Sequence, residues 1–267
     1  MTATQTLPVA RTVARAWRLV AMRPRYALRT GWIPALAVFA ASAGFGAAKA
    51  GGLDPGAAFW AMVAAILNFG LLVLALVAWQ RSALPRARLR KGTSALRLGR
   101  AEVLAMLHFP LVLFLFIPLL LPELGENLAA LSRQGPVGRA VLLPVAGVAV
   151  LVFPGGLLLT RAALMLVAIA EAGRHAVSLL DAANRVWGLA SGNSIRLFLV
   201  LYLSVIPVIV AMALLPGTLP SLAQSALRAI LVTLYVLVAG GALSSAYAAL
   251  GGVLGPAAQH KTRRGAA

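Results

Sequence analysis

Uncharged, mostly apolar runs of membrane-spanning length alternate along this chain with short stretches that carry most of its charges. Each run is close to the ~20 residues that an α-helix needs to cross a ~30 Å hydrocarbon core. The last and longest apolar region contains the turn-forming sequence Pro-Gly-Thr-Leu-Pro-Ser at 216–221, so one helix is expected to end near Leu215 and the next to begin near Leu222. The pattern predicts six transmembrane helices, at about 31–48, 56–79, 103–121, 140–160, 197–215 and 228–250.

Composition supports this pattern and argues against a water-soluble domain. Hydrophobic residues make up 61% of the 267 residues and charged residues 11%, which is too apolar for a soluble fold that would have to hold six uncharged helices. We therefore expect an all-α, polytopic integral membrane protein in which residues 1–267 form one domain. Because the chain has no cysteine, disulfides, thiol nucleophiles and thiolate metal sites are excluded.

The segment 1–30, before the first span, has the periodicity of a helix that lies along a membrane surface. Between Val9 and Arg29, arginines recur mostly every three or four residues, while Val13, Trp17 and Val20 gather on another face. We expect this helix to be interfacial, with Trp17 in the headgroup zone. Pro24 is expected to break it.

The stretch 171–190 has a similar polar stripe and predicts a second interfacial helix. Three interpretations of its charges stay open: ion pairs within the helix, between Glu171 and Arg174 and between Asp181 and Arg185; a carboxylate bonded to Arg161; or simple solvation.

Basic residues are distributed unequally between the connections. Twenty of the 24 Lys and Arg residues fall before the first span, after the last span or in every second connection, so the positive-inside rule places both termini, including the tail 251–267, in the cytoplasm. Such clusters attract anionic lipid headgroups by ~1 kcal/mol per residue near the surface. The short basic segments hold no recognition fold or aromatic groove, so no nucleic-acid partner is expected. The candidate headgroup contacts are Arg11, Arg15, Arg18, Arg86, Arg88, Arg90 and Lys91.

The six spans form three predicted hairpins. A Leu-x-x-Gly sequence at 28–31, 96–99 and 189–192 stands each time where a basic segment enters a span. Whether this is a true internal repeat or a coincidence in a chain rich in Ala, Gly and Leu stays open.

Polar residues at membrane depth are few. Asn68, in the middle of the second span, is expected to bond across helices, and His108, near the start of the third, is expected to pack at an interface. Since there are neither paired carboxylates nor clustered histidines, we expect no catalytic residue, no metal and no cofactor. The chain is therefore predicted not to be an enzyme.

Small residues repeat at four-residue intervals in two of the predicted spans. The sixth carries Gly240, Ser244, Ala248 and Gly252, and the first carries Ala40, Gly44 and Ala48. Such stripes let helix backbones approach closely in lipid. They predict packing of the first span on the sixth, with a homodimer face as the alternative.

The segment from Asp181 to Phe198 resembles one found in a six-span, YciC-like family of uncharacterised bacterial inner-membrane proteins, related to the membrane domain attached to some glycerophosphodiester phosphodiesterases. The residues that carry the resemblance are Arg161, Trp187, Gly192, Asn193 and Arg196. Family members commonly have a proline soon after the first Arg, and here 162–170 contains none. The resemblance implies a six-span membrane fold in the bacterial cytoplasmic (inner) membrane, without a phosphodiesterase domain.

Together these patterns favour a non-enzymatic membrane component that engages anionic lipid, with a protein partner or a second copy also considered, at its cytoplasmic face. The alternative is a small-molecule or lipid transporter or channel component centred on Asn68 and on the Pro-Gly-Gly break at 154–156 in the fourth span. A transporter requires a polar, water-accessible cavity at mid-membrane, whereas an interaction protein requires a closed apolar bundle.

Overall fold

The computed structural model describes residues 6–51, 55–84, 160–171, 179–215 and 219–252, together with 103, 105, 106 and 157, and the regular secondary structure of these residues is α-helical throughout. The helices are α1 (Val9–Met22), α2 (Pro24–Gly51), α3 (Pro55–Ala83), α7 (Leu179–Ala190), α8 (Ser194–Ala213) and α9 (Ser221–Ala249), and residues 160–171 are also helical. The predicted spans at 103–121 and 140–160 lie almost entirely outside the described residues. So do Arg86, Arg88, Arg90, Lys91, His108 and all but the start of the predicted tail.

Three segments among the described residues are long and apolar enough to cross a membrane. They are Val63–Ala83 in α3, Ser194–Ala213, which is α8, and Ser221–Ala249, which is α9. They coincide with the predicted second, fifth and sixth spans. The prediction of a helical chain with apolar helices of membrane length is therefore confirmed at this level. The predicted first span lies inside α2, a helix of 28 residues that contains Pro34.

Proline and turn residues end the helices where the sequence predicts. α1 ends at Met22, Arg23 leaves the helical conformation with φ −127° and ψ 50°, and Pro24 opens α2. Proline is well suited to a first helical position, because the N–H it lacks would have no partner there. Pro220 likewise stands directly before α9, which begins at Ser221, eight residues after α8 ends at Ala213. Both predicted breaks are confirmed.

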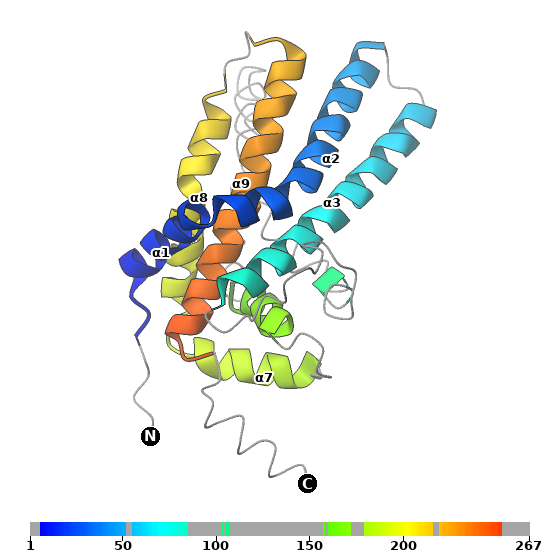
Figure 1. The fold of residues 1–267 in the computed structure, drawn as a ribbon. Helices are drawn as coiled ribbons and strands as arrows, with labels where there is room; N and C mark the ends of the chain where they lie inside the picture. Colours follow the sequence, from blue (N-terminus) through cyan, green and yellow to red (C-terminus); the bar gives the residue numbers. More distant parts are fainter. Residues whose placement is uncertain are drawn as a thin grey trace, which may run out of the picture.

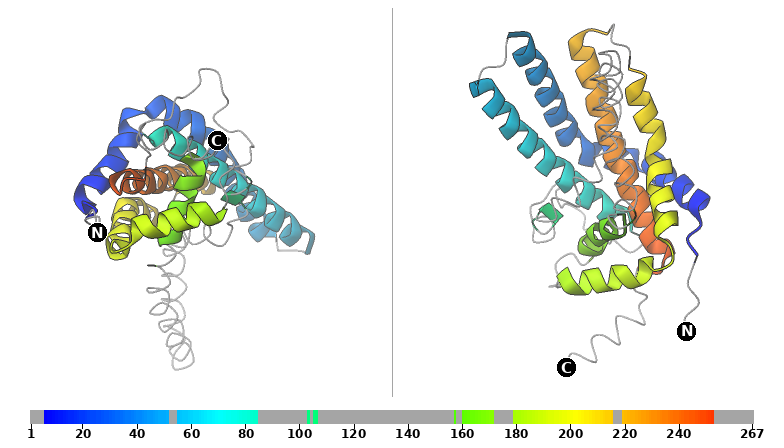
Figure 2. Two further views of the ribbon diagram at one scale, coloured as in Figure 1. Left: turned by 90° about the horizontal axis from the view of Figure 1, so that it is seen from below. Right: turned by 180° about the vertical axis from the view of Figure 1, so that it is seen from behind.

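Helix α9 is the centre of the bundle. Helices α2 and α3 form one antiparallel hairpin, α8 and α9 form another, and α7 lies across their lower end (Figure 1). α9 packs against α1, α2, α3 and α8, and its buried residues run without interruption from Tyr235 to Tyr247. Seen from below, it lies between α8 and the arm formed by α1 and α2 (Figure 2).

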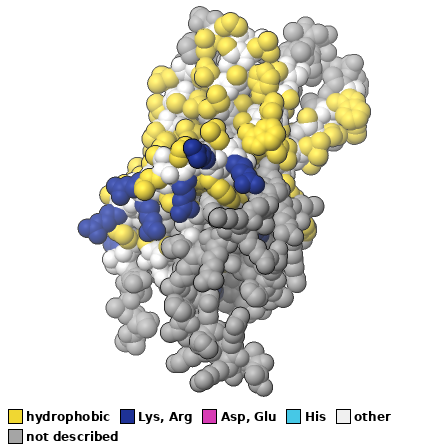
Figure 3. All heavy atoms as spheres, in the orientation of Figure 1, with side chains coloured by type: hydrophobic (Ala, Val, Ile, Leu, Met, Phe, Trp, Pro, Cys, Tyr) yellow, Lys and Arg dark blue, Asp and Glu magenta, His cyan; other side chains and the backbone are white. Residues whose placement is uncertain are grey.

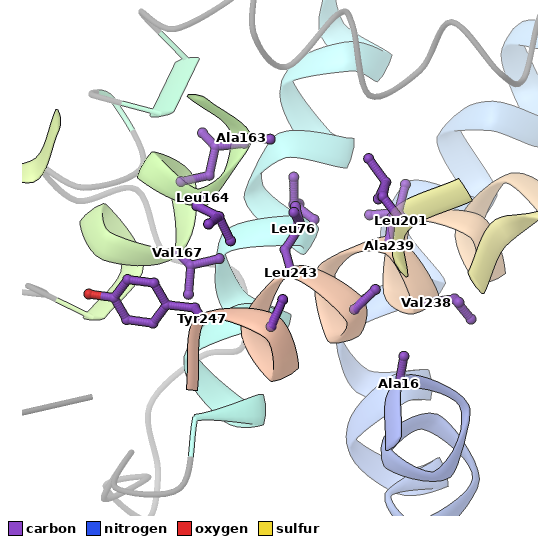
Figure 4. Close-up of a cluster of buried hydrophobic side chains, with 14 of the residues drawn as sticks. Ala16, Leu76, Ala163, Leu164, Val167, Leu201, Val238, Ala239, Leu243 and Tyr247 are labelled. Atoms are coloured by element: carbon purple, nitrogen blue, oxygen red, sulfur yellow. The ribbon is translucent and has the colours of Figure 1, made fainter. Parts of the chain in front are cut away.

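Glycines on α9 allow its neighbours to approach closely. A Cβ on Gly240 would lie 2.9 Å from Leu76 Cδ1 of α3, and one on Gly241 would lie 3.3 Å from the carbonyl oxygen of Ala16 in α1. Leu76, Leu243 and Ala16 contribute to one buried apolar cluster along α9 (Figure 4). Backbone approach of this kind increases van der Waals contact, which is the main source of helix association in an apolar solvent.

The apolar face of α1 packs on other helices, which corrects the expectation that Trp17 lies in the headgroup zone. Ala16 is completely buried, and Trp17 and Val20 pack against the core cluster. The Trp17 indole N–H donates to the backbone oxygen of Ser204 in α8, at 3.0 Å. Periodicity identified the apolar face correctly, but it could not say that α8 and α9 cover that face.

Candidate functional site

The outward face of α1 carries a row of exposed arginines. Arg11, Arg15 and Arg18 line a depression of about 480 Å³ together with Ala14, Leu19 and Met22. Guanidinium groups and apolar side chains therefore line the same depression. This combination suits a molecule with an anionic group attached to a hydrocarbon portion.

The row continues into the beginning of α2. Lys and Arg side chains form a band across the front of the molecule at the level of α1 and the start of α2, with a hydrophobic surface above it (Figure 3). We call the six exposed arginines of this region the arginine belt: Arg11, Arg15, Arg18, Arg23, Arg25 and Arg29. The first 53 residues of the chain contain no Asp or Glu. Every charged side chain in the segment that contains the arginine belt is therefore positive. The electrostatic potential of such a segment attracts anions.

Hydrogen bonds to the bundle hold the belt in place. The Asn193 side-chain oxygen, at the start of α8, accepts a bond from the Leu7 N–H at 3.0 Å, and Arg23 donates to the backbone oxygen of Ser82 in α3. The Tyr26 hydroxyl donates to the Ala78 oxygen at 3.3 Å. Burial raises the pKa of Tyr26, so this hydroxyl keeps its proton and acts as a donor at neutral pH. These bonds tie α1 and the start of α2 to α3 and α8.

Arg161 and Trp187, two of the five residues that carry the resemblance, meet beside Ser194 where α7 passes into α8. The Arg161 guanidinium carbon lies 5.6 Å from the centroid of the Trp187 ring, and Arg161 Nε donates to the Ser194 hydroxyl. Gly192 has φ +75°, a left-handed conformation that a side chain would strain. Asn193, which is buried, follows it directly. These residues therefore form the junction that places α8.

Two further features concern Arg196 and the helix that carries Arg161. Arg196 is exposed on the first turn of α8. Residues 160–171 form an unbroken helix, and the stretch 162–170 contains no proline that would interrupt it. The segment thus has an evident structural role, and its exposed arginine adds to the charge of this end of the bundle.

A second polar cluster joins the lower ends of three helical segments. Arg185 of α7 lies 3.5 Å from the Glu171 carboxylate, which also accepts a bond from the Tyr247 hydroxyl at 2.8 Å. The Arg185 guanidinium carbon is 5.7 Å from the Tyr247 ring centroid, and the group donates to the Gly252 backbone oxygen. The sequence could not reveal this cluster because 76 residues separate Glu171 from Tyr247. Arg174 and the Asp181 side chain lie outside the described residues.

The predicted small-residue stripe divides between different neighbours. Gly240 packs on α3, Ser244 is buried and Ala248 is half-buried. Gly252 follows the end of α9, and its added Cβ would lie 2.6 Å from the Tyr247 ring. The first predicted span packs on α9 through Gly31, whose Cβ would lie 2.6 Å from Thr233 Cγ2, and not through the predicted stripe at Gly44, where a Cβ would have nothing within 4 Å.

Several polar atoms are buried beside this stripe. Trp79 Nε1, both amide atoms of Gln80 and the hydroxyls of Ser244 and Ser245 are buried without a hydrogen-bond partner among the described residues. Asn68 Oδ1, eleven residues before Trp79 on α3, is also buried without a hydrogen-bond partner among the described residues. Polar groups buried in this way are costly unless they find a partner.

Comparisons with models of protein families, with curated proteins and with solved structures found no match for this chain.

Proposed function

We propose that this chain is a non-enzymatic, six-span protein of the bacterial cytoplasmic membrane, with both termini in the cytoplasm, that engages anionic lipid headgroups at its cytoplasmic face. The observation that carries the proposal is the arginine belt: six exposed arginines, anchored to the bundle, in a stretch that contains no carboxylate. A protein partner or a second copy of the chain at the same face is part of this proposal.

The contacts of α1 support binding by charge over binding by insertion. An interfacial helix that inserts needs a free apolar face, and the apolar face of α1 packs on α8 and α9. α1 can therefore contribute to membrane binding mainly through its guanidinium groups, each worth ~1 kcal/mol near an anionic surface. Arg11, Arg15 and Arg18 together would then favour anionic over neutral lipid by ~3 kcal/mol, roughly a hundredfold.

Lipid retention by the full-length protein in detergent tests this proposal. The test variant replaces the three arginines of α1 with Gln, and the control removes an equal charge from the face predicted to be external. The variants are R11Q/R15Q/R18Q and R133Q/R139Q/R228Q. We expect the first to lose its preference for phosphatidylglycerol over phosphatidylcholine, and the control to keep it.

Salt provides an independent measurement of the same interaction. Raising ionic strength from 0.1 to 1 M shortens the screening length from ~10 to ~3 Å, so the preference of the unaltered protein should decline. A preference that survives both high salt and the loss of the α1 arginines would contradict the proposal.

A transporter is the second candidate, and the buried polar atoms between α3 and α9 favour it. Gln80, Ser244 and Ser245 could take part in a hydrated pathway if the two helices separate, although Gly240 holds them closely packed in this conformation. Because the chain has no native cysteine, Ser244→Cys gives a single, nearly isosteric probe. Rapid reaction with a small, charged thiosulfonate in membranes would support a transporter, and protection would support a closed bundle.

A further inference from the structure

Three arginines form a row on one face of α1. Arg11, Arg15 and Arg18 stand four and three residues apart, so their Cβ atoms follow one another at about 5–6 Å and the row extends about 10 Å along the helix axis. All three are exposed, and they line the same depression. The opposite face of α1 fixes their backbone in place, since Ala16 is buried and Trp17 bonds to α8.

The positive charges of this row have no counter-charge within α1. Arginines three and four residues apart repel one another, and a carboxylate at either spacing would relieve the repulsion. α1 contains no Asp or Glu, and Arg11 lies in its first turn, where the helix dipole disfavours a cation. A role in topology requires positive charge on the cytoplasmic side, but it does not require arginines in one row without an acid. Anionic groups from another molecule would offset both effects.

Apolar side chains complete the lining of the depression. Ala14, Leu19 and Met22 lie beside the arginines, and Met22 is 73% exposed. A small hydrophilic anion would leave these side chains in contact with water, whereas a hydrocarbon chain attached to the anion would cover them. The volume of about 480 Å³ also falls within the ~300–1,000 Å³ typical of ligand sites. The depression therefore suits an amphiphile better than it suits a free phosphate.

We infer that the depression on α1 binds one lipid that carries two phosphate groups on a single headgroup. Arg11 and Arg18, at the two ends of the row, each contact one phosphate, and Arg15 lies between them within reach of both. One acyl chain covers the apolar side chains of the depression. This inference rests on the proposed lipid function and adds the class of lipid that the site prefers.

The preference for two linked phosphates follows from the spacing of the row. A lipid with one phosphodiester neutralises one guanidinium group and leaves two that still repel each other. A second lipid of that kind must be captured separately, whereas the second phosphate of a shared headgroup is already beside the row. A glycerol bridge keeps the two phosphates within the ~10 Å length of the row. Linking two contacts in this way raises the overall affinity by ~10²–10⁴ when the span fits.

Binding of cardiolipin to the full-length protein in a neutral detergent tests the inference. Cardiolipin has two phosphates joined by a glycerol bridge, and phosphatidylglycerol at twice its molar concentration supplies the same amount of phosphate. Native mass spectrometry gives the lipid concentration at which half of the protein carries lipid. We expect half-saturation by cardiolipin at a phosphate concentration at least about tenfold lower than by phosphatidylglycerol. Half-saturation at equal phosphate concentrations would overturn the inference.

Single substitutions at the two ends of the row distinguish linked binding from general charge attraction and from the additional acyl chains of cardiolipin. Arg11→Gln and Arg18→Gln each leave one phosphate without its partner, so both variants should lose most of the preference for cardiolipin. The control, Arg228→Gln, removes one charge from the face predicted to be external and should keep the preference. A preference for cardiolipin that persists in both end variants would overturn the inference.

Inorganic pyrophosphate tests the contribution of the acyl chain, because it supplies two linked phosphates without hydrocarbon. Burial of only two CH₂ groups is worth about tenfold in affinity. Pyrophosphate should therefore displace cardiolipin only at a concentration at least about tenfold above that of the lipid. Displacement at an equal concentration would show that the anion alone binds, and it would overturn the assignment to a lipid.

The preference for phosphatidylglycerol over phosphatidylcholine, measured in the same preparations, separates this inference from the proposed function. If that preference depends on the α1 arginines while cardiolipin shows no advantage, the lipid proposal stands and only this inference falls. If neither preference depends on these arginines, both fall.

Discussion

The contact between Gly31 and Thr233 joins the beginning of the first predicted span to α9, two residues from the arginine belt. A Cβ on Gly31 would lie 2.6 Å from Thr233 Cγ2, about 1 Å closer than the 3.5–4.0 Å at which carbon atoms attract. Thr233 cannot easily turn its methyl group away, because its hydroxyl is fixed by donation to the Ala229 oxygen at 2.9 Å. Gly31→Ala must therefore push α2 and α9 apart.

The change in stability caused by Gly31→Ala follows from two opposing effects. Overpacking of a closed contact costs about 1–3 kcal/mol, whereas replacing Gly with Ala in a helix gains up to ~1 kcal/mol. Gly44 is a matched control on the same helix, since a Cβ there would have nothing within 4 Å. Gly31→Ala should therefore be less stable than Gly44→Ala by about 1–3 kcal/mol.

Unfolding of the detergent-solubilised protein, followed by circular dichroism during an SDS titration, measures the difference. Thr233→Ala removes the clashing methyl group, so the double variant with Gly31→Ala should recover most of the lost stability relative to Thr233→Ala alone. Equal stability of the two glycine variants, or no coupling between Gly31 and Thr233 in the double-mutant cycle, would refute this packing of α2 on α9.

Three further outcomes are expected. Gly192→Ala should destabilise by about 1–2 kcal/mol because of its positive φ, whereas Gly188→Ala in α7, with nothing near its Cβ, should be neutral or stabilising; thermal melting distinguishes them. Tyr247→Phe should cost more stability than Glu171→Gln, because Tyr247 is fully buried while Glu171 is partly exposed; similar SDS midpoints would contradict this. Trp17→Phe loses an indole donor worth about 0.5–1.5 kcal/mol and should speed tryptic cleavage within α1; unaltered cleavage would show that this bond does not hold the helix.

Local chemistry in the sequence was sufficient to place several helix boundaries. Pro24 and the turn residues at 216–221 predicted the ends of α1 and α8 and the starts of α2 and α9. Uncharged runs predicted α3, α8 and α9 as apolar helices of membrane length. These signals succeed because they depend on neighbouring residues, whose backbone and solvation preferences are the same in any fold.

Contacts between distant segments could not be predicted in the same way. Periodicity showed that Trp17 belongs to an apolar face, but lipid and protein can both cover such a face, and here Ser204 of α8 meets it. The pairing of Glu171 with Arg185 was missed for a related reason. Helical spacing suggested partners three or four residues away, whereas the bundle brings together the ends of separate helices. The resemblance named Arg161 and Trp187, and only the fold shows that they touch.

The docking of α1 also determines an order of events during synthesis. Leu7, just before α1, and Trp17 within it bond to residues that lie 186 and 187 positions later in the chain, at Asn193 and Ser204. At a translation rate of about 5–20 residues per second, roughly ten to forty seconds separate the emergence of α1 from that of the surface that covers it. Until then the nascent chain presents Trp17 and its apolar neighbours without their final contacts. The last hairpin to leave the ribosome therefore completes the burial of the first helix.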